Sequence, residues 1–281
     1  MVNTYIPFDF KEALEIKNLK NTFVFAGGTD LSVKHRPWSG TNLDFSKDII
    51  FIGHLSELHE IKITNDDIFI GSCATFTEIL NNINIPKYIK LPLYNIGSPS
   101  IRNIGTLGGN ICNSSPAGDS LPMLYALDSE LELCSIDGSR TIKIIDFITG
   151  PKENILKDNE ILKNIKIPLK NFNSIYYKKI GQRKSNTITK TSIYALAVTD
   201  ESHIKDVRIA FGAVSPTPIR SKQIESQING IKKSDLTGII DNIISQYEIL
   251  INPIDDIRST KEYRKKVSIN LLKNFLLNLL T

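Results

Sequence analysis

Residues 97–122 read GSPSIRNIGTLGGNICNSSPAGDSLP and lie between apolar segments. Glycine, serine, asparagine, proline and threonine are dense here, and these residues favour turns and irregular backbone. We therefore predict an irregular loop over 97–118, followed by a helix over 121–127. Long irregular loops inside compact domains tend to be functional. This segment is thus the first candidate for a ligand-binding site.

The glycines of this loop cluster at 105–109, and a second pair, Gly27-Gly28, follows an apolar run at 22–26. The long loop matches neither the dinucleotide motif GxGxxG nor the P-loop, so neither a Rossmann dinucleotide site nor a P-loop is expected. Two glycine loops at strand ends could instead hold a pyrophosphate, each through N–H donors and a threonine hydroxyl. A lone Gly-Gly pair is more often a tight turn without a ligand.

The segments around these loops predict a mixed α and β chain. N-terminal to the long loop, the expected elements are a helix capped by Asp9 and Glu12, strands at 22–26 and 49–52, a hairpin of 61–64 with 68–72, and a helix capped by Thr75 and Glu78. Further strand-like runs recur over 131–167. Residues 168–174 are the best candidate for a linker.

The C-terminal part predicts an antiparallel meander followed by helices. The expected strands are 174–180, 193–198 and 207–214, and the expected helices are 236–250 and a terminal helix capped by Ser259 and Glu262.

Composition excludes several classes of protein. The 281 residues are 41% hydrophobic with a net charge of +4, and the lysines are spread along the chain, which argues against a nucleic-acid partner. Three widely spaced cysteines form no disulfide framework, metal site or iron–sulfur motif and indicate a reducing, cytoplasmic location. No secretion signal is apparent, and no run reaches the roughly 18 apolar residues of a membrane span.

Four motifs occur in order along the chain: AGGTDL at 26–31, the segment 97–122, KIGQR at 179–183 and RIAFGAVSPTPIR at 208–220. Together they resemble the FAD-binding subunit of xanthine dehydrogenase and related molybdenum hydroxylases. The resemblance implies an α+β fold. Residues 1–170 would form a PCMH-type FAD-binding domain of two α/β subdomains, about 1–55 and 56–170. Residues 174–281 would form a domain of the CO dehydrogenase flavoprotein C-terminal type, with a three-stranded antiparallel sheet and a helical bundle.

The same resemblance implies a non-covalent FAD site and no metal site. The cofactor-binding residues would be Val24, Phe25, Ala26, Gly27, Gly28, Thr29, Asp30, Leu31, Ile96, Thr106, Gly109, Asn110, Asp119, Leu162 and Lys179. The segment 24–31 would wrap the pyrophosphate, which Thr106, Gly109 and Asn110 would contact from the second loop. Ile96 and Leu162 would lie by the flavin ring, Asp119 by the adenosine part, and Lys179 near the isoalloxazine edge or the phosphates.

Other readings of individual residues stay open. Asp119 could cap the helix at 121–127, a role that can coexist with ligand binding, and Lys179 could be a surface lysine. Arg102 and Arg183 could each bind phosphate or pair with a local carboxylate. The four histidines have no metal-ligand spacing and are expected to serve packing or the surface.

The function that the resemblance implies is electron transfer within a heterotrimer, with no catalytic side chain in this chain. A molybdopterin-binding subunit would oxidise the substrate, an iron–sulfur subunit would carry the electrons, and FAD here would reduce NAD. Xanthine is the favoured substrate, with nicotinate or another heterocycle as an alternative. Two rivals are a nucleotide-binding module without redox turnover and a free-standing flavin reductase, like the enzyme that reduces UDP-N-acetylenolpyruvylglucosamine.

Overall fold

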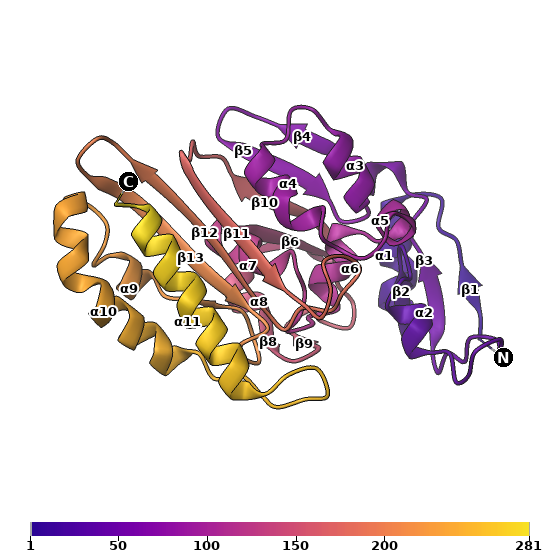
Figure 1. Ribbon diagram of the computed structural model, residues 1–281. Helices are drawn as coiled ribbons and strands as arrows, with labels where there is room; N and C mark the ends of the chain where they lie inside the picture. Colours follow the sequence, from indigo (N-terminus) through magenta and orange to yellow (C-terminus); the bar gives the residue numbers. More distant parts are fainter. Residues whose placement is uncertain (1, 281) are drawn as a thin grey trace. The chain divides into compact units, whose positions relative to one another are not determined.

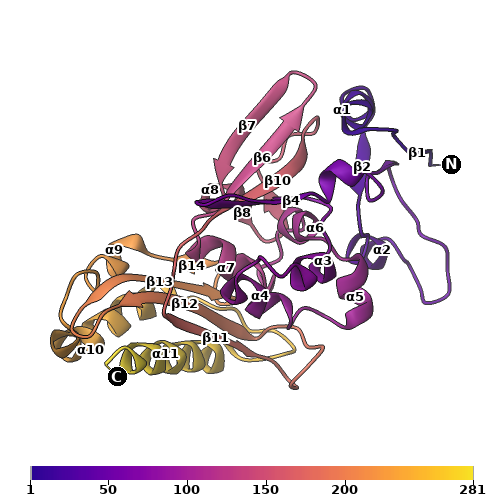
Figure 2. The same ribbon diagram turned by 90° about the horizontal axis from the view of Figure 1, so that it is seen from above.

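The computed structural model describes residues 2–280, which form two compact units that are discontinuous in sequence (Figures 1 and 2). Unit 1 comprises residues 1–86, 96–114 and 129–168, and unit 2 comprises 87–95, 115–128 and 169–281. The predicted domains at 1–170 and 174–281 are contiguous, and their boundaries stay a prediction.

Unit 1 begins with a three-stranded parallel sheet in the order β1-β3-β2, made of Thr4–Tyr5, Asp48–Phe51 and Thr22–Phe25. Helix α1 (Phe10–Leu19) starts where expected, because the Asp9 carboxylate accepts the amide of Glu12 at 2.8 Å. Its apolar side chains enter a core shared with β3. The short helix α2 (Leu31–Lys34) follows the first glycine pair.

A five-stranded antiparallel sheet completes unit 1, in the order β4-β5-β10-β6-β7. Its strands are Ile61–Ile63, Asp67–Gly71, Ile161–Pro168, Glu130–Ser135 and Gly138–Lys143. The predicted hairpin and the capping box of Thr75 and Glu78, which opens α3 (Phe76–Asn81), are confirmed. Smaller elements are η1 (Ser56–Leu58), α8 (Ile144–Phe147), β8 (Ile148–Gly150) and β9 (Glu153–Asn154).

The irregular loop predicted for 97–118 is wrong, because two short helices occupy much of it. Helix α5 (Pro99–Ile104) has proline in its first turn, and the Ser98 hydroxyl accepts the amide of Ile101 at 3.4 Å. Helix α6 (Leu107–Cys112) is capped by Thr106. The serine, proline and threonine that looked like loop residues are therefore helix-starting residues.

Unit 2 is built on a sheet in the order β11-β12-β13-β14, with strands Ser174–Ile180, Thr191–Thr199, Ile204–Gly212 and Ile219–Arg220. The predicted three-stranded meander is confirmed, and the two-residue β14 extends it. Both faces are covered: α10 (Lys233–Leu250) and α11 (Lys261–Asn278) lie on one side, and α4 (Lys87–Leu93) and α7 (Leu121–Ala126) on the other (Figure 2). Helix α9 (Lys222–Glu225) follows β14.

Strand β12 shows why both faces must be covered, since its residues 191–197 are all buried. Ile193, Ala195 and Ala197 join the core beneath the long helices, whereas the Tyr194 hydroxyl donates to the Tyr88 carbonyl of α4 at 2.8 Å. The predicted cap of the terminal helix is wrong by one residue. The cap is Thr260, whose hydroxyl accepts the amide of Tyr263 at 3.3 Å.

Candidate cofactor-binding site

A cavity of about 360 Å³ opens in unit 1, within the size range of small-molecule sites. It lies among the end of β2, the start of α2, helix α6 and strand β10. All the predicted cofactor-binding residues line it except Asp119 and Lys179. The two glycine segments, more than 70 residues apart in sequence, therefore border one space.

The first segment, 26–30, turns sharply because Gly28 adopts φ +67°, which glycine adopts without strain. A Cβ on Gly27 would lie 1.7 Å from the carbonyl oxygen of Ile104, so packing against α5 also demands glycine. Among residues 2–280, no acceptor within the chain takes the amides of 27–30. Successive free amides of this kind suit an anion such as phosphate.

The second segment, 106–110, differs in this respect. The amide of Gly108 donates to the Ser72 carbonyl at 3.0 Å, and the amide of Gly109 donates to the Thr106 hydroxyl at 3.0 Å. Our expectation that both segments offer free N–H donors is therefore wrong for these two glycines. Instead, its glycines let a ligand come close to the backbone, and Thr106 contributes a hydroxyl.

Gly109 is the glycine with the most open surroundings in this segment. A Cβ there would meet only the Thr106 hydroxyl, at 2.8 Å, whereas a Cβ on Gly108 would lie 2.6 Å from the backbone of Ser72. Gly109 is exposed and lines the cavity. A side chain at Gly109 would thus occupy ligand space, and outside the backbone of α6 the neighbour it would displace is the Thr106 hydroxyl that caps the helix.

The remaining wall is largely apolar, with Ile96, Ile161 and Leu162 among its residues. It also contains Cys73 and Cys112, which sequence reasoning did not assign to the site. Burial raises the pKa of both thiols to about 12. Near neutral pH both are uncharged, so they supply polarisable surface and no thiolate nucleophile.

Sequence reasoning also missed two cations in the lining, Lys34 of α2 and Lys152 of the turn between β8 and β9. Lys34 stands one helical turn after Asp30, and that spacing was the only signal for it. No local sequence pattern predicts that Lys152 lies at the cavity, because tertiary contacts determine where its hairpin packs.

Asp119 and Lys179 belong to unit 2 and bind each other. The Lys179 ammonium donates to the Asp119 carboxylate at 2.6 Å and to the Asn95 carbonyl at 2.8 Å, and the Thr189 hydroxyl donates to the other carboxylate oxygen. Burial raises the pKa of Asp119, and Lys179 opposes that shift. The alternative role of Asp119 as a helix cap is wrong, because the N-cap residue of α7 is Ser120 and the two Asp119 oxygens are bound by Lys179 and Thr189.

Two arginines considered for phosphate or carboxylate bind backbone instead. Arg102 donates to the carbonyls of Ile96 and Gly97 at 3.0 and 3.2 Å, and Arg183 donates to the carbonyl of Asn186. Within residues 2–280, no cluster of His, Cys, Asp or Glu has the makings of a metal site, and no helix is long and apolar enough to cross a bilayer.

The arrangement fits an extended dinucleotide cofactor. It combines free amides at 27–30 for an anion, an uncrowded glycine at 109, and an apolar wall for a flat ring system. These features fit the class of flavin-binding proteins that the sequence predicts.

Comparisons with known proteins agree with that class. Residues 1–170 match the FAD binding domain in molybdopterin dehydrogenase, and residues 176–279 match the CO dehydrogenase flavoprotein C-terminal domain. The chain therefore belongs to the family of FAD subunits of molybdenum hydroxylases, and its cofactor is FAD. This membership sets it apart from free-standing flavin reductases.

Three relatives bear different substrate names. The chain is 30% identical to the glyceraldehyde dehydrogenase medium chain of Sulfolobus acidocaldarius, covering 92% of this chain and 90% of that protein. It is 29% identical to the xanthine dehydrogenase FAD-binding subunit of Escherichia coli O157:H7, covering 86% and 82%. It is 33% identical to the nicotinate dehydrogenase FAD-subunit of Eubacterium barkeri, covering 74% and 71%.

The fold also matches a solved structure, the reconstituted CO dehydrogenase from Oligotropha carboxidovorans. The TM-score is 0.87 with 21% identity, covering 98% of this chain and 96% of that one. The predicted α+β fold class is thereby confirmed.

Proposed function

We propose that this chain is the electron-transfer subunit of a xanthine dehydrogenase-type complex, receiving electrons from an iron–sulfur subunit and delivering them to NAD. The observation that carries the proposal is the cavity between the two glycine segments, in a chain 29% identical to a xanthine dehydrogenase FAD-binding subunit. The oxidation of the purine itself belongs to a molybdopterin-binding partner.

FAD supplies the redox chemistry, because a bound flavin exchanges electrons singly or in pairs and can release a hydride. The chain's own residues bind and orient it. Residues 24–31 with Thr106, Gly109 and Asn110 would hold the pyrophosphate, and Ile96 and Leu162 would cover the ring. The apolar wall would keep water from the ring system.

Asp119 and Lys179 would act as a pair on the cofactor. A lysine ammonium has three N–H donors, and two of those of Lys179 are taken by Asp119 and Asn95. One donor is left for the flavin edge or a phosphate. Thr189 and Asp119 would thus position Lys179, with the adenosine part as the further contact of Asp119.

Nicotinate is the second candidate substrate, and one observation favours it. The nicotinate dehydrogenase relative has the higher identity, 33%, although over a smaller part of the chain, 74%. Since the substrate would bind a partner subunit, the cavity in this chain does not distinguish the two.

The assembly we propose is a cytoplasmic heterotrimer of flavin, iron–sulfur and molybdopterin-binding subunits. Cys73, Cys112 and Cys134 are free thiols, which suits a reducing compartment.

The test is to co-express the chain with the iron–sulfur and molybdopterin-binding subunits of the proposed complex and to purify the assembly. NADH formation is then followed with xanthine, nicotinate or glyceraldehyde as the substrate. We expect NADH with xanthine. If NADH forms only with nicotinate or glyceraldehyde, the proposed substrate is wrong. If xanthine reduces an artificial dye but no NADH forms, the proposed acceptor is wrong.

A further inference from the structure

The turn between β8 and β9 holds a lysine in an unfavourable backbone conformation. Pro151 and Lys152 form this two-residue turn, and Lys152 has φ +63°. Proline followed by a left-handed residue is the pattern of a type II turn, whose second central position ordinarily has glycine.

Tertiary hydrogen bonds keep this turn against the end of helix α6. The amide of Lys152 donates to the Ser114 carbonyl at 2.8 Å, and Ser114 is itself left-handed at φ +48°. The Asn154 side chain donates to the Cys112 carbonyl and to the Ser114 hydroxyl, both at 3.0 Å. The backbone would be served equally by glycine at 152, so these bonds do not explain the lysine side chain.

The Lys152 side chain lines the cavity at an exposed position. Among the described residues, 2–280, it has no carboxylate within ion-pair distance. The other charged residues in the lining are Asp30 and Lys34. A dinucleotide brings two negative charges on its pyrophosphate, and Asp30 adds a third in the same space. Coulomb attraction in a partly desolvated cavity therefore favours a cation.

We propose that Lys152 binds the pyrophosphate of the cofactor, and that the strained turn is retained because it carries this cation to the cavity. Non-glycine residues in left-handed conformations are found at ligand clamps, where the surrounding structure holds them. The inference rests on the assignment of the cavity as the FAD site.

The experiment measures binding of FAD by the full chain through quenching of flavin fluorescence, with Lys152→Met, Lys152→Gly and Lys152→Arg. The controls are Lys62→Met, at an exposed lysine of β4 outside the cavity, and Gly109→Val, which blocks the cavity. We expect Lys152→Met and Lys152→Gly to weaken FAD binding about five- to tenfold and to reduce its salt dependence. Lys152→Arg and Lys62→Met should bind like the wild type.

Lys152→Gly separates the proposal from a purely structural turn, because glycine relieves the backbone. Its Tm should stay equal or rise by about 1–3 °C while its FAD affinity falls. ADP has the pyrophosphate without the flavin, so its competition with FAD should weaken by a similar factor in Lys152→Met.

Unchanged affinity for FAD and ADP in Lys152→Met would overturn the proposal, even if the reduction potential of bound FAD shifted, because the cation would then act on the ring. If Gly109→Val also binds FAD like the wild type, the assignment of the cavity is at fault. If only Gly109→Val loses FAD, the assignment of the cavity as the FAD site is upheld, and only the proposed role of Lys152 is rejected.

Discussion

At the scale of single residues, different physical constraints require glycine at the different glycine positions around the cavity. Gly27 and Gly108 are required by backbone packing, and Gly28 by its left-handed conformation and the ring of Phe25. Gly109 is limited only by the hydroxyl of its own helix cap. Gly109 is therefore the position at which a substitution tests the ligand rather than the fold.

Gly109→Val should weaken FAD binding by about tenfold or more, equivalent to about 1.4 kcal/mol, because the branched side chain enters the space of the phosphates. Released FAD per mole of protein and circular dichroism provide the readouts. Gly238→Ala is the matched control, since Gly238 lies in α10 with no atom near its Cβ position. Equal flavin content in Gly109→Val and wild type, both folded, would place the site elsewhere.

The site could be predicted from sequence where it consists of consecutive residues after a strand. Residues 24–31 line the cavity as a block, because a strand that ends in glycines brings them to one edge. Lys152, Cys73 and Cys112 were missed, because their places depend on a hairpin, a strand end and a helix end that meet only in the folded chain.

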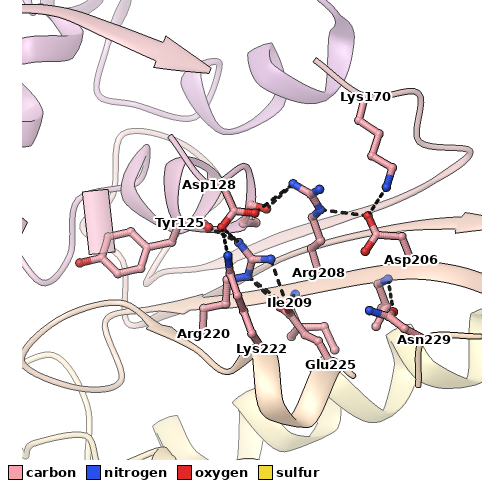
Figure 3. A network of polar contacts seen from close by, with 12 residues as sticks. Tyr125, Asp128, Lys170, Asp206, Arg208, Ile209, Arg220, Lys222, Glu225 and Asn229 are labelled. Atoms are coloured by element: carbon pink, nitrogen blue, oxygen red, sulfur yellow. Dashed lines mark hydrogen bonds and ion pairs between the residues drawn. The ribbon is translucent and has the colours of Figure 1, made fainter. Parts of the chain in front are cut away.

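At the scale of elements, an ion-pair network holds α7 against β13 and β14 (Figure 3). Arg220 donates to the Tyr125 carbonyl at 2.6 Å, pairs with Asp128 at 3.0 Å and binds Glu225 at 2.9 Å. Arg208 also pairs with Asp128 and donates to the last carbonyl of α7. Cationic side chains thus satisfy the C-terminal end of the helix.

Arg220→Met should lower the free energy of unfolding by about 3–5 kcal/mol, because it leaves the buried Glu225 carboxylate without its partner. Urea denaturation measures this loss. The double variant Arg220→Met/Glu225→Gln should recover much of it, since glutamine carries no charge and can still accept the amide of Ile209. No recovery in the double variant would mean that Arg220 acts mainly on α7.

The loss in Arg220→Met should depend on pH. Burial already raises the pKa of Glu225 in the wild type, against the effect of Arg220. Without Arg220 the folded-state pKa rises further above its unfolded value, so the folded variant binds a proton more readily than the unfolded chain does. Its stability relative to the wild type is therefore lowest at neutral pH and improves as the pH falls.

The limits of sequence reasoning at this scale concern the segment 97–118. Its composition is that of a loop, but Ser98 and Thr106 are N-caps and Pro99 lies in a first helical turn. Both helices are six residues long and form no apolar repeat by which periodicity could detect them. The strands of the meander were predictable because each is a compact β-rich run bounded by turn residues.

At the scale of the whole molecule, the two compact units are each assembled from separate stretches of sequence. The segments 87–95 and 115–128 belong to the same unit as residues 169–281, although they flank the glycine segment of unit 1. Local sequence patterns do not reveal which unit a segment joins, because that depends on contacts between residues far apart in the sequence.

The isolated chain should transfer electrons from NADH to an artificial acceptor but should not oxidise xanthine, nicotinate or glyceraldehyde. Its family holds FAD, whereas none of its three cysteines forms a cluster-binding motif. Dye reduction by NADH and by each substrate would be compared for the purified chain, with Gly109→Val as the flavin-depleted control. NADH activity should fall with flavin content, and adding the partner subunits should create substrate activity. Substrate oxidation by this polypeptide alone, with mass spectrometry showing no other subunit, would contradict its role as an electron-transfer subunit.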